Sequence, residues 1–497
     1  MQGLPAPLPG RLAGIALPAP APLPAARPPR APAPEGDKRV ADLTQVLDRF
    51  GLRDGQVISF HHHYRNGERV IEPVLRAAQS RGLRGLTLAA SSLFPCHAGL
   101  IPFIEDGTVT HIVTDYMRGP LADAVQAGRL AGKAVLQSHG ARARAIGSGA
   151  LMVDIAFVAA PLAHPCGDAT GRGGRLACGP LGYPAVDAAH ARATVVLADE
   201  IATDPLPLVD IPGHHVDAVL AFRNPGAPEG ISSGSTLPLD TPAARSIGAL
   251  TAQVIAAAGL MRNGMSLQSG AGGYSLGAVP IIGQAMADAG LRGGFLSGGI
   301  TGAHVALLEA GLFDEILDVQ CFDAAAVASS MRNPMHRMMT AAEYASPLHP
   351  AAVVERLDVM LLGAVEVDHA FNVNVAASAD GRILGGPGGH PDTAQGASLS
   401  IVTTTLQGGG HPKIVPQVRC VTTEGCDVDV IVTDQGFAVN PRRQDLRDAL
   451  HGLSAPMLAV EDLARMAAEG LPHLPRGMSR AGHIIVEHRL GHRLDMI

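Results

Sequence analysis

The chain has 497 residues, of which 47% are hydrophobic and 3% aromatic, and its formal net charge is −7. This length exceeds one ordinary hydrophobic core and indicates more than one domain. The scarcity of aromatic side chains argues against single-stranded nucleic acid as a ligand, because such proteins stack bases on aromatic rings. No basic block stands out in the sequence, so binding to a large polyanion is not predicted either.

The cysteines and the apolar runs indicate where the protein works. The six cysteines include no Cys-x-x-Cys pair, and such sparse thiols are typical of reduced cysteines in a cytosolic protein. No apolar run reaches the roughly 18–20 residues that a membrane-spanning helix needs. We therefore expect a cytoplasmic protein that binds neither nucleic acid nor membrane.

The N-terminal stretch differs in composition from the rest of the chain. The first 34 residues hold eleven prolines, and they lack a charged start and an unbroken apolar segment. Both features would be needed for a secretory signal, so none is expected. We expect residues 1–36 to form a disordered Pro/Ala-rich tail, extended where it is ordered at all.

Beyond residue 36, helix-like and strand-like segments alternate. Apolar residues between Val70 and Ala78 recur with helical spacing and predict a helix over 68–81. Short, almost continuous apolar runs are typical of strands that are covered on both faces, as in a parallel sheet. Such runs predict strands at 86–90, 112–116, 153–160, 194–198 and 218–222.

The second half repeats this alternation after a polar stretch, residues 224–242, that is rich in Gly, Pro, Ser and Thr and is typical of a linker. The predicted helices cover 243–259, 278–289, 444–451 and 457–468, and the predicted strands cover 294–296, 315–319, 359–362 and 428–433. We therefore predict an α/β protein with two tandem α/β domains and mostly parallel sheets, over residues 37–235 and 236–497. Ligands of open α/β sheets bind beyond the carboxyl ends of the strands.

Three glycine-rich loops in the second half, residues 268–277, 295–302 and 384–393, are the first candidates for a ligand site. Glycine lets the backbone approach a ligand closely and leaves amide groups that can donate to an anion. Acyl transfer needs such donors, because the carbonyl oxygen becomes negative in the tetrahedral intermediate. Each loop taken alone can equally be a tight turn or a close strand–helix contact. The candidate residues are Ser269, Gly270, Gly272 and Gly273, then Ser297, Gly298 and Gly299, then Gly388, Gly389, His390 and Asp392.

The segment 363–377 has a different pattern. Its alternation predicts a strand, in which Glu366, Asn372 and Asn374 share one face because side chains two apart point the same way. A face lined by one carboxylate and two amides, near a glycine loop, suits a hydroxylated carboxylate ligand. The alternative is the solvated face of an antiparallel strand.

Several of these segments together resemble the citrate lyase α subunit family, whose members have a CoA-transferase fold. These segments include E-V-D-H-A-F-N-V-N-V at 366–375 and G-G-P-G-G-H-P-D-T at 385–393. The others are V-I-S-F-H-H-H-Y-R-N-G at 57–67, L-F-P-C-H at 93–97 and V-I-V-T-D-Q-G-F-A at 430–438. The F-N-V-N-V signature and the H-H-H signature at 61–63 are specific, whereas the glycine turns alone are not. The resemblance extends from about residue 38 to the end of the chain.

The resemblance implies a reaction and partners. The α subunit exchanges the acetyl group on an acyl carrier protein for citrate, so citrate and acetyl-carrier give acetate and citryl-carrier. A separate β subunit then cleaves citryl-carrier. The carrier (γ) subunit bears a phosphoribosyl-dephospho-CoA arm, and no cofactor is expected on this chain itself. A homo-oligomer within the complex is also expected.

The resemblance also implies a mechanism. Related CoA-transferases attack the thioester with a glutamate, and the counterpart here is 295–302, where Gly298 or Gly299 takes the place of that glutamate. A citrate carboxylate would then attack the acetyl thioester directly and form a mixed anhydride. Gly298, Gly299, Gly388 and Gly389 are the expected catalytic residues, and the remaining candidates, including Glu366, Asn372 and Asn374, are expected to bind the substrate. Holding the reactants together can supply roughly 7–11 kcal/mol of the barrier reduction.

Two competing hypotheses stay open. In the first, the chain is a general acetate or acyl-CoA transferase whose covalent carboxylate is Glu366. In the second, it is a scaffold subunit without catalytic activity. A metal site is not expected, because the adjacent side chains of His61, His62 and His63 would point to opposite faces of a strand and could not easily bind one ion.

Overall fold

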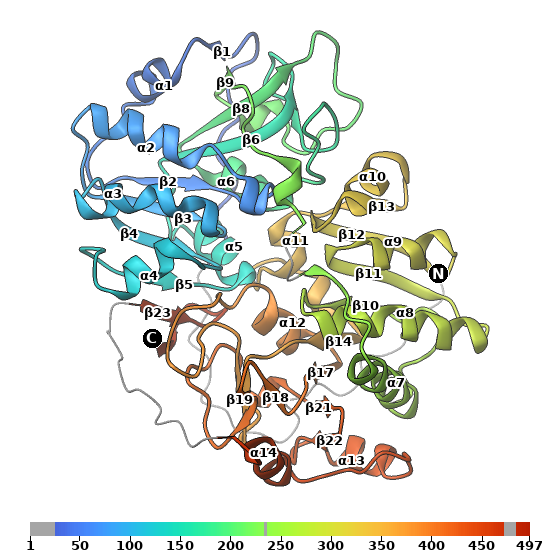
Figure 1. Ribbon diagram of the computed structural model, residues 1–497. Helices are drawn as coiled ribbons and strands as arrows, with labels where there is room; N and C mark the ends of the chain where they lie inside the picture. Colours follow the sequence, from blue (N-terminus) through green and yellow to red (C-terminus); the bar gives the residue numbers. More distant parts are fainter. Residues whose placement is uncertain (1–24, 233–235, 472–483) are drawn as a thin grey trace.

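The computed structural model describes residues 25–232, 236–471 and 484–497. These residues form an α/β protein with two mostly parallel mixed sheets, one built mainly by each half of the chain (Figure 1). The α/β architecture and the mostly parallel pairing predicted from the apolar runs are confirmed. The boundaries at residues 36 and 236 remain a prediction. No described helix is both long enough and apolar enough to cross a bilayer.

The first sheet has the strand order β1-β9-β8-β6-β2-β3-β4-β5-β23-β24, and β7 pairs with β6. Its strands are β1 (Arg39–Val40), β2 (Val57–Phe60), β3 (Leu86–Ala90), β4 (Val109–Thr114), β5 (Ala134–Leu136), β6 (Ile155–Ala163), β7 (Ala169–Thr170), β8 (Ala193–Ile201), β9 (Ala218–Ala221), β23 (Ile484–Glu487) and β24 (Arg493–Met496). Its helices are α1 (Leu43–Phe50), α2 (Ile71–Ser80), α3 (Ile101–Glu105), α4 (Pro120–Gln126), α5 (His139–Ser148) and α6 (Gly182–His190). β6 and the first six residues of β8 are buried almost throughout, which explains their near-continuous apolar sequence.

The second sheet has the order β13-β12-β11-β10-β14-β17-β21-β22. Its strands are β10 (Leu267–Ser269), β11 (Gly293–Ile300), β12 (Phe313–Cys321), β13 (His336–Met338), β14 (Val359–Leu362), β17 (Leu399–Thr403), β21 (Val430–Thr433) and β22 (Gly436–Val439). The helices are α7 (Pro242–Ala257), α8 (Gly273–Asp288), α9 (Gly302–Glu309), α10 (Ala324–Arg332), α11 (Ala341–Ala345), α12 (His390–Gly396), α13 (Gln444–Leu450) and α14 (Val460–Ala468). Smaller ladders join β15 (Glu366–Asp368), β16 (Val373–Asn374) and β20 (Ile414–Val415), and β18 (Gln407–Gly408) with β19 (His411–Pro412).

The last strands of the chain return to the first sheet. β23 pairs in parallel with β5, and Ile485 lies opposite Val135 in the ladder. In Figure 1 the dark red β23 lies beside β5, whereas the rest of the second half lies below and to the right. The predicted boundaries placed these strands with the second half of the chain. Their pairing is instead with the first half, where Ile484 and Val486 are fully buried.

The described end of the Pro/Ala-rich tail, residues 25–36, contacts the first half of the chain. The backbone amides of Arg27, Arg30 and Ala33 donate to carbonyl groups of the first half. The guanidinium of Arg30 also forms an ion pair with Asp217 at 2.7 Å. Proline has no amide donor, but these three residues are not prolines and keep theirs. This part of the tail therefore lies against the domain in an extended conformation. Residues 1–24 lie outside the described residues.

The two halves meet at α5, α6 and α11, which lie between the sheets in Figure 1. One buried apolar cluster contains Ile146 and Tyr183 from the first half together with Met339 and Tyr344 from the second. A shared core of this kind holds the halves in a fixed relation and brings the carboxyl ends of their strands to one junction.

Candidate active site at the junction of the two halves

Gly298 and Gly299, which were expected in a loop, lie within β11 at a shift of its pairing register with β12. Gly298 has no free space for a side chain. The backbone there has φ +101°, which L side chains rarely adopt. A Cβ atom at this position would overlap the side-chain amide of Gln268 on the neighbouring strand β10. A side chain at position 298 would therefore require Gln268 to move. At Gly299, a Cβ would overlap the ring of Phe322.

The side chain of Gln268 links this segment to the loop at 384–393. Its amide nitrogen donates to the hydroxyl of Tyr344 on α11 at 2.7 Å. That hydroxyl lies 2.5 Å from the position a Cβ would take at Gly389. The two loops that the sequence analysis assigned to the catalytic site therefore converge on one pair of buried side chains.

Two buried oxygen atoms at this point have no hydrogen-bond partner within the described part of the chain. They are Oε1 of Gln268 and Oγ of Ser297, and these two residues lie opposite each other in the β10–β11 ladder. Buried polar atoms are nearly always bonded, and an unpaired one costs about 1–3 kcal/mol. Oε1 of Gln268 can only accept, so a ligand hydroxyl could bond to it, whereas the hydroxyl of Ser297 could also donate to a carboxylate. Substrate binding by Ser297 remains a prediction.

The first half contributes an aspartate–histidine pair to the same junction. Ser138 caps the N-terminus of α5 and so places His139 at the first helical position. The backbone amide of His139 donates to the carbonyl of Gly388 at 2.9 Å, and the amide of Gly388 donates to the carbonyl of Asp115 at 3.1 Å. The Asp115 carboxylate lies 2.7 Å from Nδ1 of His139. Burial raises the pKa of Asp115, and the neighbouring His139 opposes this shift.

Sequence reasoning missed Asp115, His139, Gln268 and Tyr344. A signal existed for the first two, because each follows a buried strand of the first half, β4 or β5, at its carboxyl end. Polar residues at that edge of a parallel sheet are candidates for a site. Tyr344 follows no such rule, because α11 is a short helix that reaches the junction only through tertiary packing.

Asp392 and His390, at the start of α12, both have their polar atoms bonded within the chain. The carboxylate of Asp392 accepts from the hydroxyl of Ser138 at 2.7 Å and from the amide of Gly140 at 2.8 Å. It therefore ties α12 to the N-terminus of α5, where a negative charge is favourable. Nε2 of His390 lies 2.9 Å from the carbonyl of Gly363, and Nδ1 lies 2.7 Å from the hydroxyl of Thr423. Substrate binding by these two residues remains a prediction.

The contacts of His390 predict a pH dependence of stability. Burial lowers its pKa from 6.5 to about 4, so it stays neutral in the folded protein. The unfolded chain takes up a proton at this side chain as the pH falls below about 6.5, and the folded chain does so only near pH 4. Stability present above pH 6.5 is therefore lost as the pH falls towards 4, by up to about 1.4 kcal/mol per pH unit for one proton. We expect urea unfolding at pH 7.5, 6.0 and 5.0 to show this loss.

The matched variants isolate the contribution of His390. The His390→Gln variant should lose less stability between pH 6.5 and 5 than the wild type, whatever its stability at pH 7.5. A His451→Gln variant removes an exposed histidine and should retain the wild-type pH dependence. An identical pH dependence in H390Q and the wild type would contradict the assignment of a neutral, buried imidazole.

The polar segment 363–377 is a hairpin rather than the single strand that was predicted. Glu366 and Asn374 lie opposite each other in an antiparallel pair, and the amide of Asn374 donates to Glu366 at 3.0 Å. Asn372 lies in the turn and bonds to Asp368, so it does not share their face. The reason is local, because the carboxylate of Asp368 accepts from the amides of Ala370 and Asn372 and closes the turn.

The loop at 268–277 is bonded mainly to its own neighbours. The hydroxyl of Ser269 lies 3.0 Å from Nε2 of His304, and the amide of Gly270 donates to Leu361 at 2.7 Å. Gly272 is the N-cap of α8, and a Cβ at Gly273 would contact Leu239. These residues therefore form a tight turn between a strand and a helix. A contact between this loop and the substrate remains a prediction.

The expectation of no metal also remains a prediction. Nδ1 of His61 lies 2.6 Å from Nδ1 of His63, so these two rings bond to each other. Among the described residues, two groups have ligand atoms close enough to hold an ion. They are Asp318, Cys321 and His336, and Glu424, Cys426 and Asp427.

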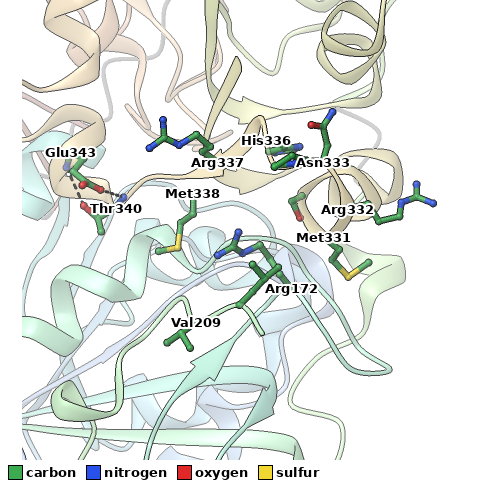
Figure 2. Close-up of a pocket in the computed structure, with 13 residues that line it drawn as sticks. Arg172, Val209, Met331, Arg332, Asn333, His336, Arg337, Met338, Thr340 and Glu343 are labelled. Carbon is green, nitrogen blue, oxygen red and sulfur yellow. Dashed lines mark hydrogen bonds between the residues drawn. The ribbon is translucent and has the colours of Figure 1, made fainter. Parts of the chain in front are cut away.

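A pocket of about 630 Å³ lies outside the glycine loops (Figure 2). Arg172 and Val209 reach it from the first half, and residues from Ser330 to Glu343 line it from the second half. None of the site residues predicted from the sequence lines this pocket. The candidate active site is therefore defined by the converging loops and their unpaired oxygen atoms.

Relatives with the same architecture and length are known. A sequence model described as "Citrate lyase, alpha subunit (CitF)" matches residues 36–497. The citrate lyase alpha chain of Klebsiella pneumoniae is 38% identical over 471 residues, which cover 94% of this chain and 92% of that protein. The alpha chain of Escherichia coli (strain K12) is 38% identical over 462 residues, which cover 93% and 90%.

Solved structures agree with these sequences. The putative alpha subunit of citrate lyase from Streptococcus mutans, in complex with citrate, matches with a TM-score of 0.90 at 36% identity, over 95% of this chain and 93% of that one. The malonate decarboxylase alpha subunit from Acinetobacter baumannii has a TM-score of 0.62 at 16% identity over 88% and 89%, a likeness of fold alone. The chain therefore belongs to the citrate lyase α subunit family, which provides the citrate CoA-transferase subunit of that enzyme.

Proposed function

We propose that this chain exchanges acetyl for citrate on a carrier thioester, without a covalent enzyme intermediate. The observation that carries the proposal is the filled space at Gly298, where the amide of Gln268 lies in the place a side chain would need. The Streptococcus mutans relative is described in complex with citrate. Citrate as the substrate of this chain is consistent with the two unpaired oxygen atoms of Gln268 and Ser297.

The proposed reaction begins with attack by a citrate carboxylate on the carbonyl carbon of the acetyl thioester. The carbon–sulfur bond breaks, and citryl-acetyl anhydride and the carrier thiolate result. The sulfur then attacks the citryl carbonyl of the anhydride, and acetate leaves. The amide of Gly388 already donates to the carbonyl of Asp115, so among the four predicted glycines the amides of Gly298, Gly299 and Gly389 would stabilise the oxyanions. Each such donor contributes about 10²–10³ in kcat. Burial of the junction strengthens these interactions, since few waters compete for the donors.

The proposal includes the partners and the location of the chain. We expect it to work with a β subunit that cleaves citryl-carrier and with a carrier subunit that presents the phosphoribosyl-dephospho-CoA arm. Several copies of the chain within the complex and a cytoplasmic location complete the proposal. The chain itself would hold no cofactor, because both acyl groups travel on the carrier.

The alternative covalent route has a specific candidate, Glu366, whose surroundings do not suit a nucleophile. Only 2% of this residue is exposed. Its Oε2 accepts from the amide of Asn374 at 3.0 Å and from the backbone amide of Arg419 at 2.7 Å. Attack on a thioester would require these bonds to break and the buried hairpin to open.

We expect no acylated side chain during turnover. The purified chain would be incubated with acetyl-CoA alone, quenched, and examined by intact-mass spectrometry and by hydroxylamine trapping. The expected mass is that of the unmodified chain, because the first attack requires citrate. A parallel sample with acetyl-CoA and citrate should form citryl-CoA, which a pure scaffold could not do. A hydroxamate at Glu366 or at any other carboxylate would contradict the direct mechanism.

A further inference from the structure

His139 is a titratable side chain of the junction whose ring is held at Nδ1 and whose Nε2 has no bonded partner among the described residues. Nδ1 lies 2.7 Å from the Asp115 carboxylate, whose side chain is 0% exposed, whereas the side chain of His139 is 13% exposed. Its Nε2 lies 3.6 Å from the position of a Cβ at Gly388. Nε2 thus faces the loop at 384–393, which contains a proposed oxyanion donor.

The Asp115 contact fixes the chemistry of this ring. A neutral imidazole that carries its proton on Nδ1 donates that proton to the carboxylate and leaves Nε2 free to accept one. A buried carboxylate also stabilises the imidazolium that forms when Nε2 is protonated. The hydrogen bond from the backbone amide of His139 to the carbonyl of Gly388 holds the ring beside the loop at 384–393. The pair is therefore built to exchange a proton at one atom, Nε2.

The groups that face His139 from the surrounding elements do not compete for this role. They are His62, Asp115, Arg142, Tyr183, Tyr344 and Asp392. Burial lowers the pKa of His62 well below its usual value and raises the pKa values of Tyr183 and Tyr344. His62 and the two tyrosines are therefore neutral near pH 7. Arg142 is paired with Asp187, and Asp392 is bonded to the N-terminus of α5.

We propose that Nε2 of His139 is the general acid and base of the acyl exchange: it protonates the carrier sulfur as the acetyl thioester breaks and removes that proton before the second attack. The inference rests on the proposed function. In the first step, citrate carboxylate, acetyl thioester and imidazolium give citryl-acetyl anhydride, thiol and neutral imidazole. In the second step, thiol, anhydride and imidazole give citryl thioester, acetate and imidazolium. The proton returns to His139 at the end of each cycle, and no further reactant is needed.

The leaving sulfur explains why such a residue is useful. An alkyl thiol has a pKa of about 8.5, so its thiolate is a poor leaving group in a buried site unless a proton reaches it. General acid–base catalysis of this kind contributes about 10²–10⁴ in rate. An aromatic thiol of low pKa leaves as a stable thiolate and has little need of the proton. The two kinds of thioester therefore distinguish a proton donor from a ring that only packs against Tyr183 and Tyr344.

The experiment compares the wild type with the His139→Gln variant on acetyl-CoA and on S-acetyl-4-nitrothiophenol, with citrate present. We expect H139Q to lose about 10²–10⁴ in kcat with acetyl-CoA and less than about 10-fold in thiol release from the aryl thioester. The His451→Gln control removes an exposed histidine that follows α13 and should match the wild type with both substrates. An equal loss on both substrates would overturn the proposal, because a structural role does not depend on the leaving group.

A pH profile gives a second readout. Because the first step needs the imidazolium, kcat of the wild type with acetyl-CoA should fall at alkaline pH, and H139Q should lack this limb. A limb retained unchanged in H139Q would overturn the role of His139. Absence of any citrate-dependent thiol release by the wild type would instead contradict the proposed function itself.

Discussion

The Gly298→Ala variant is expected to lose at least about 100-fold in kcat for citryl-CoA formation. The new Cβ would overlap the side-chain amide of Gln268, which must move and thereby lose its 2.7 Å bond to Tyr344. The φ of +101° adds about 1–3 kcal/mol of backbone strain. Loss of one properly placed oxyanion donor costs about 10²–10³ in kcat. Initial rates with acetyl-CoA and citrate, measured by coupled detection of citryl-CoA, would check this.

A second glycine separates backbone strain from the loss of the site. Gly259, after α7, also has a positive φ, +72°, but a Cβ there would have no neighbour within 4 Å. Gly259→Ala should therefore lower stability by an amount similar to that of the strain in G298A and leave kcat within about twofold of the wild type. If G298A retained more than a tenth of wild-type kcat while folded, the crowding of Gln268 would not be the basis of the mechanism.

Replacement of Arg142 by alanine is expected to lower the free energy of unfolding by about 3–5 kcal/mol. Both terminal nitrogens of Arg142 bond to the carboxylate of Asp187 at 2.7 Å, and both residues are 2% exposed. The guanidinium also donates to the carbonyl of Ala89 on β3. Removing the guanidinium leaves the buried carboxylate of Asp187 without its partner. This costs far more stability than replacing both residues with apolar ones. Urea unfolding followed by far-ultraviolet circular dichroism would measure the change.

An exposed ion pair is the matched control for this stability prediction. Arg76 pairs with Glu72 one turn away on α2, and their side chains are 66% and 45% exposed. Arg76→Ala should change the free energy of unfolding by less than about 1 kcal/mol, because water screens the pair. Replacing Arg142 and Asp187 together by methionine and leucine should recover much of the loss in R142A. Equal, small effects of R142A and R76A would show that the buried pair is not essential to α5.

The His139 and Asp392 contacts connect stability to activity, because both lie where α5 meets the glycine loop at 384–393. Arg142 is on the same helix, one turn beyond His139. The activity of an R142A variant that is folded at low temperature should therefore also be measured. It would test whether small movements of α5 displace Nε2 of His139. This coupling follows from the short bonds that run from Ser138 and Gly140 to Asp392.

Some features of this protein followed from local sequence. Apolar runs at 86–90 and 359–362 coincide with β3 and β14, because a strand buried on both faces needs apolar residues at successive positions. The glycine segment at 268–277 follows the end of β10, since close turns select glycine. The alternation at 363–377 indicated strand structure but did not reveal the turn. The bonds of Asp368 that close the turn interrupt the strand pairing, whereas the alternation of apolar and polar residues continues through it.

By itself, the sequence determined the α/β class, the family resemblance and the absence of a carboxylate at 298 and 299. Only the tertiary structure decided which side chains surround those glycines. Gln268, Tyr344 and His139 come from three separate elements, and β23 joins β5 across almost 350 residues of chain. Contacts of this kind depend on how the two halves pack at α5, α6 and α11, and no local spacing of residues encodes that packing.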